Sequence, residues 1–192
     1  MPVGEDQAPL IEQTNEIVRR INRQVGAEVL REAQALIPQM GRLPGVDGKA
    51  KMSKAQNNAI APSSSADAIR DAVKRMYTDP NHLRASDPGT VEGNIVFTYL
   101  DAFDEDRATV ERLKAKYRAG GLGDMVVKRR LEEQLQALLA PIRERRERLA
   151  REPGYVFDVL REGTERAKGV TQRTLDEVRS ALGTFSFDAV KR

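Results

Sequence analysis

The feature that most constrains the fold is a helical repeat of apolar residues, which runs through most of the chain after Pro62. Residues three or four positions apart lie on one face of a helix, so such a repeat predicts amphipathic helices. It is clearest in two long segments, the first at Val127, Leu131, Leu135, Leu138, Leu139 and Ile142, the second at Val156, Val159, Leu160, Ala167, Val170, Thr174, Val178 and Leu182. We therefore predict a mainly α-helical protein in which both apolar stripes belong to a core. Pro141 is expected to kink the first helix, and Gly163 would allow a neighbour to approach the second.

Shorter helices are predicted around these two segments. Ser64 and Asp67 have the spacing of a capping box ahead of a helix, and Gly120-Gly121 ends another. The apolar residues of these two helices are Ile69, Val73 and Met76, then Val110, Leu113 and Tyr117. The run from Ile95 to Phe103 fits a strand or a helix by periodicity alone.

The first 62 residues have a different pattern. Leu10 to Ile21 repeat at helical spacing, and this helix should stop by Gly26. Two short apolar pieces follow, 28–30 and 35–37, which are candidate strands or connectors. The loop near residue 62 is therefore the predicted division of the chain.

Composition excludes several kinds of site. The chain of 192 residues has no cysteine, which excludes disulfides and thiolate metal sites, and it has no apolar run long enough to cross a membrane. With no signal peptide at its start, the expected location is the cytoplasm.

Charge is distributed unevenly along the chain. Residues 1–110 hold 13 Lys and Arg against 16 Asp and Glu, whereas residues 111–192 hold 19 against 13. A basic half suits contact with a phosphate backbone. The strongest candidates are Arg143, Arg145 and Arg146. The equally good alternative is a solvated helix face, because the pairs Arg143–Glu147 and Glu144–Arg148 have the i,i+4 spacing of internal ion pairs.

One loop carries a pattern with chemical meaning. Lys51-Met52-Ser53-Lys54-Ala55 follows a stretch rich in glycine and proline. Two ammonium groups three residues apart on a flexible loop can converge on one polyanion and stabilise charge as a triphosphate is split. Two lysines in a loop are also common on solvated surfaces, so this pattern by itself leaves both interpretations open.

The loop resembles the KMSKS signature of class I aminoacyl-tRNA synthetases, with Ala55 in place of the final serine. The opening Val3-Gly4-Glu5-Asp6-Gln7 resembles the VGxDQ segment of the tryptophanyl branch, where the tyrosyl branch has GGSDQ. Further segments resemble bacterial tryptophanyl-tRNA synthetase in the family's order: 76–82, 92–103, 120–124, 138–145 and 161–167. The resemblance covers about residues 2 to 183 and favours a helix for 95–103.

The resemblance implies a fold and a division into domains. Residues 1–62 would be the carboxy-terminal remnant of a doubly wound α/β nucleotide-binding domain, residues 63–183 a helical domain that binds the tRNA anticodon arm, and residues 184–192 a tail. No HxGH pattern occurs in the 192 residues, whose single histidine is His82. We therefore expect a carboxy-terminal portion that lacks the HIGH-motif half of the enzyme.

The resemblance also implies a reaction, in which tryptophan is activated with ATP and passed to tRNA(Trp). Lys51 and Lys54 would be catalytic and hold the leaving pyrophosphate, with Met52, Ser53 and Ala55 against the nucleotide. The ATP site would also include Leu43 beside the adenine and Gly4, Glu5, Asp6 and Gln7 near the ribose, and Val3 would line the indole pocket. Magnesium accompanies ATP in this family, which is homodimeric, and the chain offers no protein cage of its own for the metal.

Two hypotheses about function follow. The chain is either part of a tryptophan–tRNA ligase, inactive without the remaining half, or a non-catalytic tRNA-binding or regulatory module derived from a synthetase.

Overall fold

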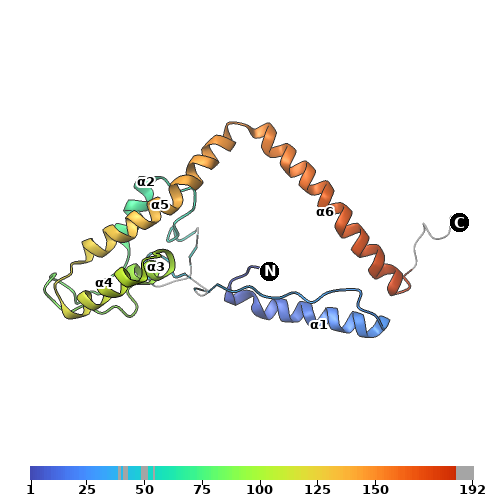
Figure 1. Cartoon of the computed structure of the whole chain (residues 1–192), viewed down its shortest axis with the longest axis horizontal. Coiled ribbons are helices and arrows are strands. Elements are labelled where there is room, and N and C mark those ends of the chain that lie inside the picture. Colours follow the sequence, from blue (N-terminus) through green and yellow to red (C-terminus); the bar gives the residue numbers. More distant parts are fainter. Residues whose placement is uncertain (39, 41–42, 49–51, 54, 185–192) are drawn as a thin grey trace. The chain divides into compact units, whose positions relative to one another are not determined.

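The structure is a computed structural model that describes residues 1–38, 40, 43–48, 52–53 and 55–184. Its elements are the 3₁₀-helix η1 (Glu5–Gln7) and the α-helices α1 (Ala8–Val25), α2 (Ala66–Arg75), α3 (Ile95–Phe103), α4 (Arg107–Ala119), α5 (Asp124–Ala150) and α6 (Pro153–Ala181) (Figure 1). The prediction of a mainly helical protein is confirmed.

The chain divides into two compact units, one formed by Met1–Gly41 and Glu152–Arg192, the other by Arg42–Arg151. The predicted boundary at residue 62 separates the two domains that the family resemblance implies, and it stays a prediction.

Helix α1 ends where the sequence predicts, at Gly26. Pro9 lies in its first turn, where a missing N–H costs nothing, and Gly26 caps its end in the left-handed conformation with φ of +70°. The chain then returns along the helix, held by two asparagine side chains. Asn15 exchanges two hydrogen bonds with the backbone of Ala33, and Asn22 bonds the backbone of Val29 and Leu30.

The two candidate strands, 28–30 and 35–37, are connectors in this chain. Among the described residues, β pairing is limited to one isolated parallel bridge between Pro2 and Leu36. Its hydrogen bonds run from the Val3 N–H to the Leu36 carbonyl and from the Leu36 N–H to the Met1 carbonyl, at 3.2 and 2.8 Å. A single pair of extended segments cannot form a stable sheet in water.

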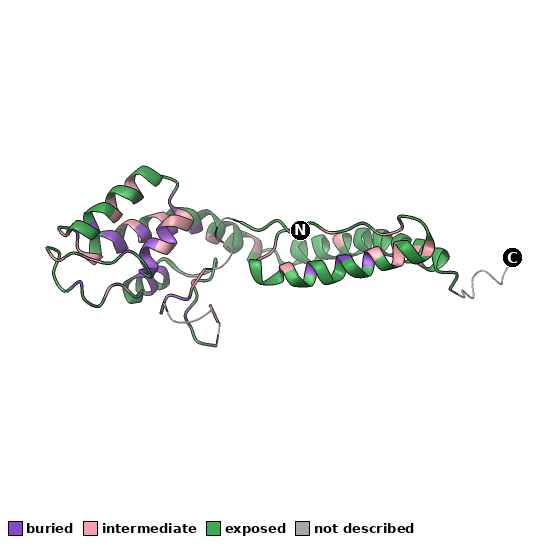
Figure 2. Ribbon diagram, turned by 90° about the horizontal axis from the view of Figure 1, so that it is seen from below, coloured by how far each residue is buried: buried purple, intermediate pink, exposed green. Residues whose placement is uncertain are grey.

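The hydrophobic core lies in the unit Arg42–Arg151, where α5 packs against both α2 and α3, and α3 packs against α4. Buried residues, drawn in purple, gather on these helices (Figure 2). The largest fully buried side chains are those of Tyr99, Tyr117, Phe97, Ile69, Met76, Leu100 and Leu131. The run 95–103 is helical, as the resemblance favours, and its apolar character all round reflects burial on most sides.

The start of α2 differs from the prediction by one residue. Ser65 is the N-cap, and its hydroxyl accepts from the Ala68 N–H at 3.2 Å. The Ser64 hydroxyl instead accepts from the Ala61 N–H in the preceding turn. Asp67 pairs with Arg70 one turn further on, so the predicted Ser64–Asp67 capping box does not form.

A buried ion pair fastens the junction between α3 and α4 to α5. Asp104, which ends α3, has a side chain only 1% exposed, and both its oxygens accept from the Arg130 guanidinium of α5, at 2.7 and 3.0 Å. One of these oxygens also accepts from the Asp106 N–H. A bidentate pair of this kind fixes the orientation of both side chains.

Helix α6 departs from the prediction that its apolar stripe belongs to a core. No described residue of α6 is buried, and Phe157 is 70% exposed. A Cβ atom added at Gly163 would meet no described atom within 4 Å beyond the helix's own backbone. A periodic stripe tells which face of a helix seeks a partner, but not whether this chain supplies one. In the described part of the chain, no helix is both long and apolar enough to span a membrane.

Candidate functional site

The loop that carries the KMSKA pattern begins from a well-fastened base. We call residues 43–58 the signature loop, of which 49–51 and 54 lie outside the described residues. Val46 is buried in the core of the helical unit, and its carbonyl accepts from the Tyr77 N–H at 3.2 Å. The Tyr99 hydroxyl of α3 donates to the Pro44 carbonyl at 2.7 Å. The loop therefore belongs structurally to the helices that follow it.

Tyr99 is suited to this role because its hydroxyl stays protonated. Burial raises its pKa to about 12, and the nearby Asp47 carboxylate adds to the increase. A neutral phenol in the helical core can donate to the Pro44 carbonyl throughout the physiological pH range.

Asn58 joins the two arms of the signature loop. Its backbone carbonyl accepts from the Val46 N–H at 2.8 Å. Its side chain reaches into the KMSKA pattern itself, where Oδ1 accepts from the Ser53 N–H at 2.7 Å. On the other side its Nδ2 donates to Asp47 Oδ2 at 3.2 Å. Asn58 is buried, so these bonds are shielded from water.

The predicted ATP residues of this loop are only partly described. Lys51 and Lys54 lie outside the described residues. Leu43 and Met52 are partly buried and pack against the hydrophobic core, while Ala55 is exposed in a turn. The apolar residues thus anchor the loop on the helical unit.

The other predicted ATP residues belong to the unit that contains α1. Gly4 caps η1, and its carbonyl accepts from the Gln7 N–H at 3.0 Å. The side chains of Glu5, Asp6 and Gln7 are exposed, and Val3 is half-buried beside the bridge to Leu36. The residues predicted for one nucleotide site therefore come from two compact units.

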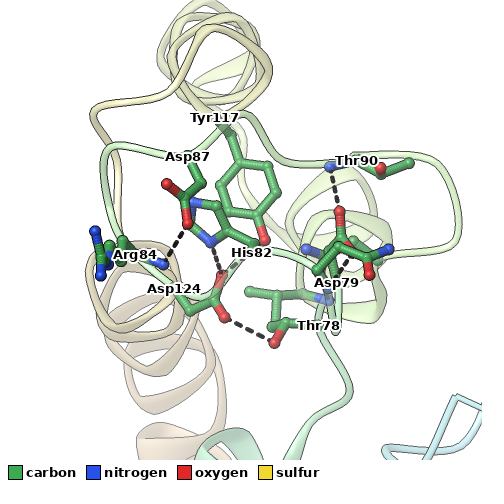
Figure 3. A network of polar contacts seen from close by, with 11 residues as sticks. Thr78, Asp79, His82, Arg84, Asp87, Thr90, Tyr117 and Asp124 are labelled. Atoms are coloured by element: carbon green, nitrogen blue, oxygen red, sulfur yellow. Dashed lines mark hydrogen bonds and ion pairs between the residues drawn. The ribbon is translucent and has the colours of Figure 1, made fainter.

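A polar network that sequence reasoning did not assign surrounds the first residue of α5 (Figure 3). The Asp124 carboxylate receives the Tyr117 hydroxyl at 2.7 Å, the Thr78 hydroxyl at 2.8 Å and Nδ1 of His82 at 3.1 Å. The same carboxylate, together with burial, raises the pKa of Tyr117, with burial the larger cause. A carboxylate at the start of a helix is also favoured by the helix dipole. Thr78, His82 and Asp124 lie in the segments 76–82 and 120–124 that resemble the family, and this resemblance is the only feature of the sequence that points to the network.

Asp79 organises the adjoining turn. Its two carboxylate oxygens accept from the Asn81 and Thr90 N–H groups, each at 2.8 Å, and these bonds hold its pKa below the ordinary value. Among the described residues, Nε2 of His82 is the one buried side-chain polar atom without a hydrogen-bond partner. The network fastens residues 78–90 to α4 and α5, and we interpret it as structural.

The three candidate tRNA arginines are not equivalent. Arg143 is half-buried, and its guanidinium donates to the Ser64 carbonyl at 3.4 Å and to Gln136 Oε1 at 3.2 Å. Arg145 and Arg146 are exposed. Among the described residues, the ion pairs of α5 include neither Arg143–Glu147 nor Glu144–Arg148. The Arg143 guanidinium instead turns toward the Ser64 carbonyl, just ahead of α2.

Comparisons with known proteins agree with these motifs. A profile of the tRNA synthetases class I (W and Y) matches residues 1–140. A tryptophan–tRNA ligase of Clostridium longisporum is 53% identical over 99% of this chain and 56% of its own length. One from Streptococcus pyogenes is 50% identical over 97% of this chain, again over 56% of its own length. The chain thus spans about half the length of the curated relatives it matches.

One solved structure agrees with this family, and a second shares the fold. The tryptophanyl-tRNA synthetase of Campylobacter jejuni, crystallised with ADP and tryptophan, superposes on 95% of this chain and 56% of its own, with a TM-score of 0.70 and 27% identity. The Mycoplasma pneumoniae tryptophanyl-tRNA synthetase shares the fold, with a TM-score of 0.71 over 96% of this chain and 56% of its own. The chain therefore belongs to the class I tRNA synthetases for tryptophan and tyrosine, and its homologues are tryptophan–tRNA ligases.

Proposed function

We propose that this chain is a working part of a tryptophan–tRNA ligase. The observation that carries the proposal is the 53% identity to the Clostridium longisporum ligase, which extends over 99% of the chain and so includes the signature loop. The fastening of that loop to the helical unit by Val46 and Tyr99 supports it, since a loop that must engage a triphosphate needs a fixed base.

In the proposed reaction, a carboxylate oxygen of tryptophan attacks the α-phosphorus of ATP. The bond from that phosphorus to the bridging oxygen breaks, and pyrophosphate leaves. A ribose hydroxyl of the terminal tRNA adenosine then attacks the carbonyl of the adenylate, and AMP leaves. Lys51 and Lys54 hold the leaving pyrophosphate, a role that grows stronger as negative charge develops on it.

The remaining site residues would bind and orient the substrates. Met52, Ser53 and Ala55 form the loop surface toward the nucleotide, and Leu43 lies beside the adenine. Gly4 allows the backbone to approach the ribose, with Glu5, Asp6 and Gln7 near its hydroxyls, and Val3 lines the indole pocket. Magnesium accompanies the nucleotide and shields the charge of its phosphates.

The helices after residue 62 are proposed to hold the anticodon arm of tRNA(Trp). Arg145 and Arg146 are the better candidates for phosphate contact because they are exposed on α5. The Arg143 guanidinium already donates to the Ser64 carbonyl and to Gln136, so it is less available for a phosphate.

Pyrophosphate exchange tests the proposed reaction. A complete enzyme is obtained by joining this chain to the part of the Clostridium longisporum ligase that it does not match. We expect tryptophan-dependent exchange from the complete enzyme and none from the 192 residues alone, which hold no HxGH pattern. Pyrophosphate exchange at an ordinary synthetase rate by the 192 residues alone would contradict the proposal that the active site needs the other part of the enzyme.

Binding of tRNA should depend steeply on salt. Replacing Arg145 and Arg146 with glutamine should flatten the plot of log K against log salt by roughly 0.7–0.9 for each phosphate that the variant no longer neutralises, because fewer counterions are released. The matched control replaces Arg20 and Arg23, which are exposed on α1, with glutamine and should leave the slope unchanged. Filter binding over a salt series measures both slopes. Equal slopes for both variants and the unmodified chain would mean that the arginine run is a solvated helix face.

A further inference from the structure

We propose that Asn58 is a positioning residue for the signature loop. Its side-chain oxygen accepts from the Ser53 N–H, in the centre of the KMSKA pattern, and so holds the backbone of the signature loop at that residue. This inference rests on the proposed function, and it adds a residue that lies outside the pattern by which the loop is found.

The first support is the number of constraints that meet at this residue. Asn58 is 2% exposed, and its side chain bonds Ser53 on one arm of the loop and Asp47 on the other. A third, longer contact of 3.4 Å joins its Nδ2 to Gln56 Oε1. Its own carbonyl accepts from Val46, which is buried in the core. The position of Ser53 is therefore linked through one side chain to the helical unit.

The second support is the lack of room beside Asn58. A Cβ atom built at Gly45 would lie 2.4 Å from Nδ2 of Asn58 and 2.8 Å from Oδ1 of Asp47. Gly45 does not have the positive φ that favours glycine, so a glycine is needed here for space. The side chain of Asn58 is thus held by packing as well as by hydrogen bonds.

The chemistry of the site explains why the residue is an asparagine. Ser53 presents a donor and needs an acceptor, whereas Asp47 presents a carboxylate and needs a donor. A short side-chain amide offers both, with the acceptor and the donor on separate atoms. An aspartate would keep the bond to Ser53 but would place one carboxylate against another, and an alanine would leave the Ser53 N–H without this partner.

Hydrogen exchange of the Ser53 amide tests the geometry without any catalysis. In the 192-residue chain we expect this amide to be protected, and Asn58→Ala should speed its exchange about tenfold, the effect of one neutral hydrogen bond. Gly45→Ala should do the same by displacing the Asn58 side chain. Unchanged Ser53 exchange in both variants, with native circular dichroism, would overturn the inference.

Kinetics of the complete enzyme tests the positioning role. Asn58→Ala should lower kcat for tryptophan-dependent exchange up to about 10²-fold, the cost of a small misplacement of a catalytic group, and leave KM for tryptophan unchanged. Asn58→Asp should also be slow. Adding Asp47→Asn to it should restore kcat to within about tenfold, because the amide at position 47 now donates to the carboxylate at position 58.

The outcomes separate this inference from the proposed function. Normal kcat for Asn58→Ala, in an enzyme that loses activity with Lys51→Ala, would overturn the role of Asn58 alone. Normal kcat for both lysine variants would refute the proposed use of the loop, and Ser53 exchange would still report whether Asn58 holds it. A slow Asn58→Asp variant that Asp47→Asn rescues is the result that supports the inference most directly.

Discussion

Replacing Lys51 or Lys54 with alanine in the complete enzyme is expected to lower kcat for pyrophosphate exchange by about 10²–10³, the usual effect of removing one preorganised electrostatic interaction. KM for ATP should rise far less. The charge on the leaving pyrophosphate grows toward the transition state, so an ammonium group binds that state better than it binds ATP. Steady-state exchange at varied ATP concentration separates the two parameters.

Ala55→Ser is the matched control in the same loop. It adds the hydroxyl that the family's signature has, and one neutral hydrogen bond should change the rate by no more than about tenfold. If both lysine variants keep normal kcat, the loop is an ordinary solvated basic loop, and the resemblance of residues 51–55 to KMSKS has no catalytic meaning.

Arg130→Leu is expected to cost about 3–5 kcal/mol of unfolding free energy, because it leaves the Asp104 carboxylate buried without its partner. Leucine keeps an apolar side chain of similar reach at this position, so most of the loss should come from the unpaired charge. Urea unfolding followed by circular dichroism measures it.

Two further variants serve as controls for this prediction. Arg118→Leu breaks the exposed pair with Glu92 and should cost at most about 1 kcal/mol. Asp104→Asn combined with Arg130→Leu removes both charges and should recover part of the loss. A change below about 1 kcal/mol for Arg130→Leu would mean that water reaches Asp104 and the pair contributes little.

The helices are predictable from this sequence because their signals are local. Gly26 and Gly120 end helices as predicted, and the stripe of α5 is buried at Val127, Leu131, Leu135 and Leu139. Leu138 and Ile142, which the same stripe assigned to the core, are exposed. The N-cap of α2 is harder to predict, since three consecutive serines offer three caps and only the backbone conformation selects Ser65. The exposure of α6 could not be predicted, because periodicity does not identify the partner of a helix.

The same difference between local patterns and tertiary contacts applies to the candidate site. The KMSKA and VGEDQ patterns are contiguous, so the sequence alone can identify them. The groups that fasten the loop are far from it in sequence: Tyr99 bonds Pro44 across 55 residues. Asn58 lies close by, but its role depends on the fold of the loop and on the room that Gly45 leaves. Such roles need tertiary contacts that no local pattern encodes.

Charging of tRNA(Trp) is the measurement that tests the central claim most directly, since it requires activation, transfer and tRNA binding together. The complete enzyme carrying this chain should attach labelled tryptophan to tRNA(Trp), and the Lys51→Ala and Lys54→Ala variants should lose most of that rate. Tight binding of tRNA(Trp) with no charging by the complete enzyme would contradict the account and identify the chain as a non-catalytic tRNA-binding module.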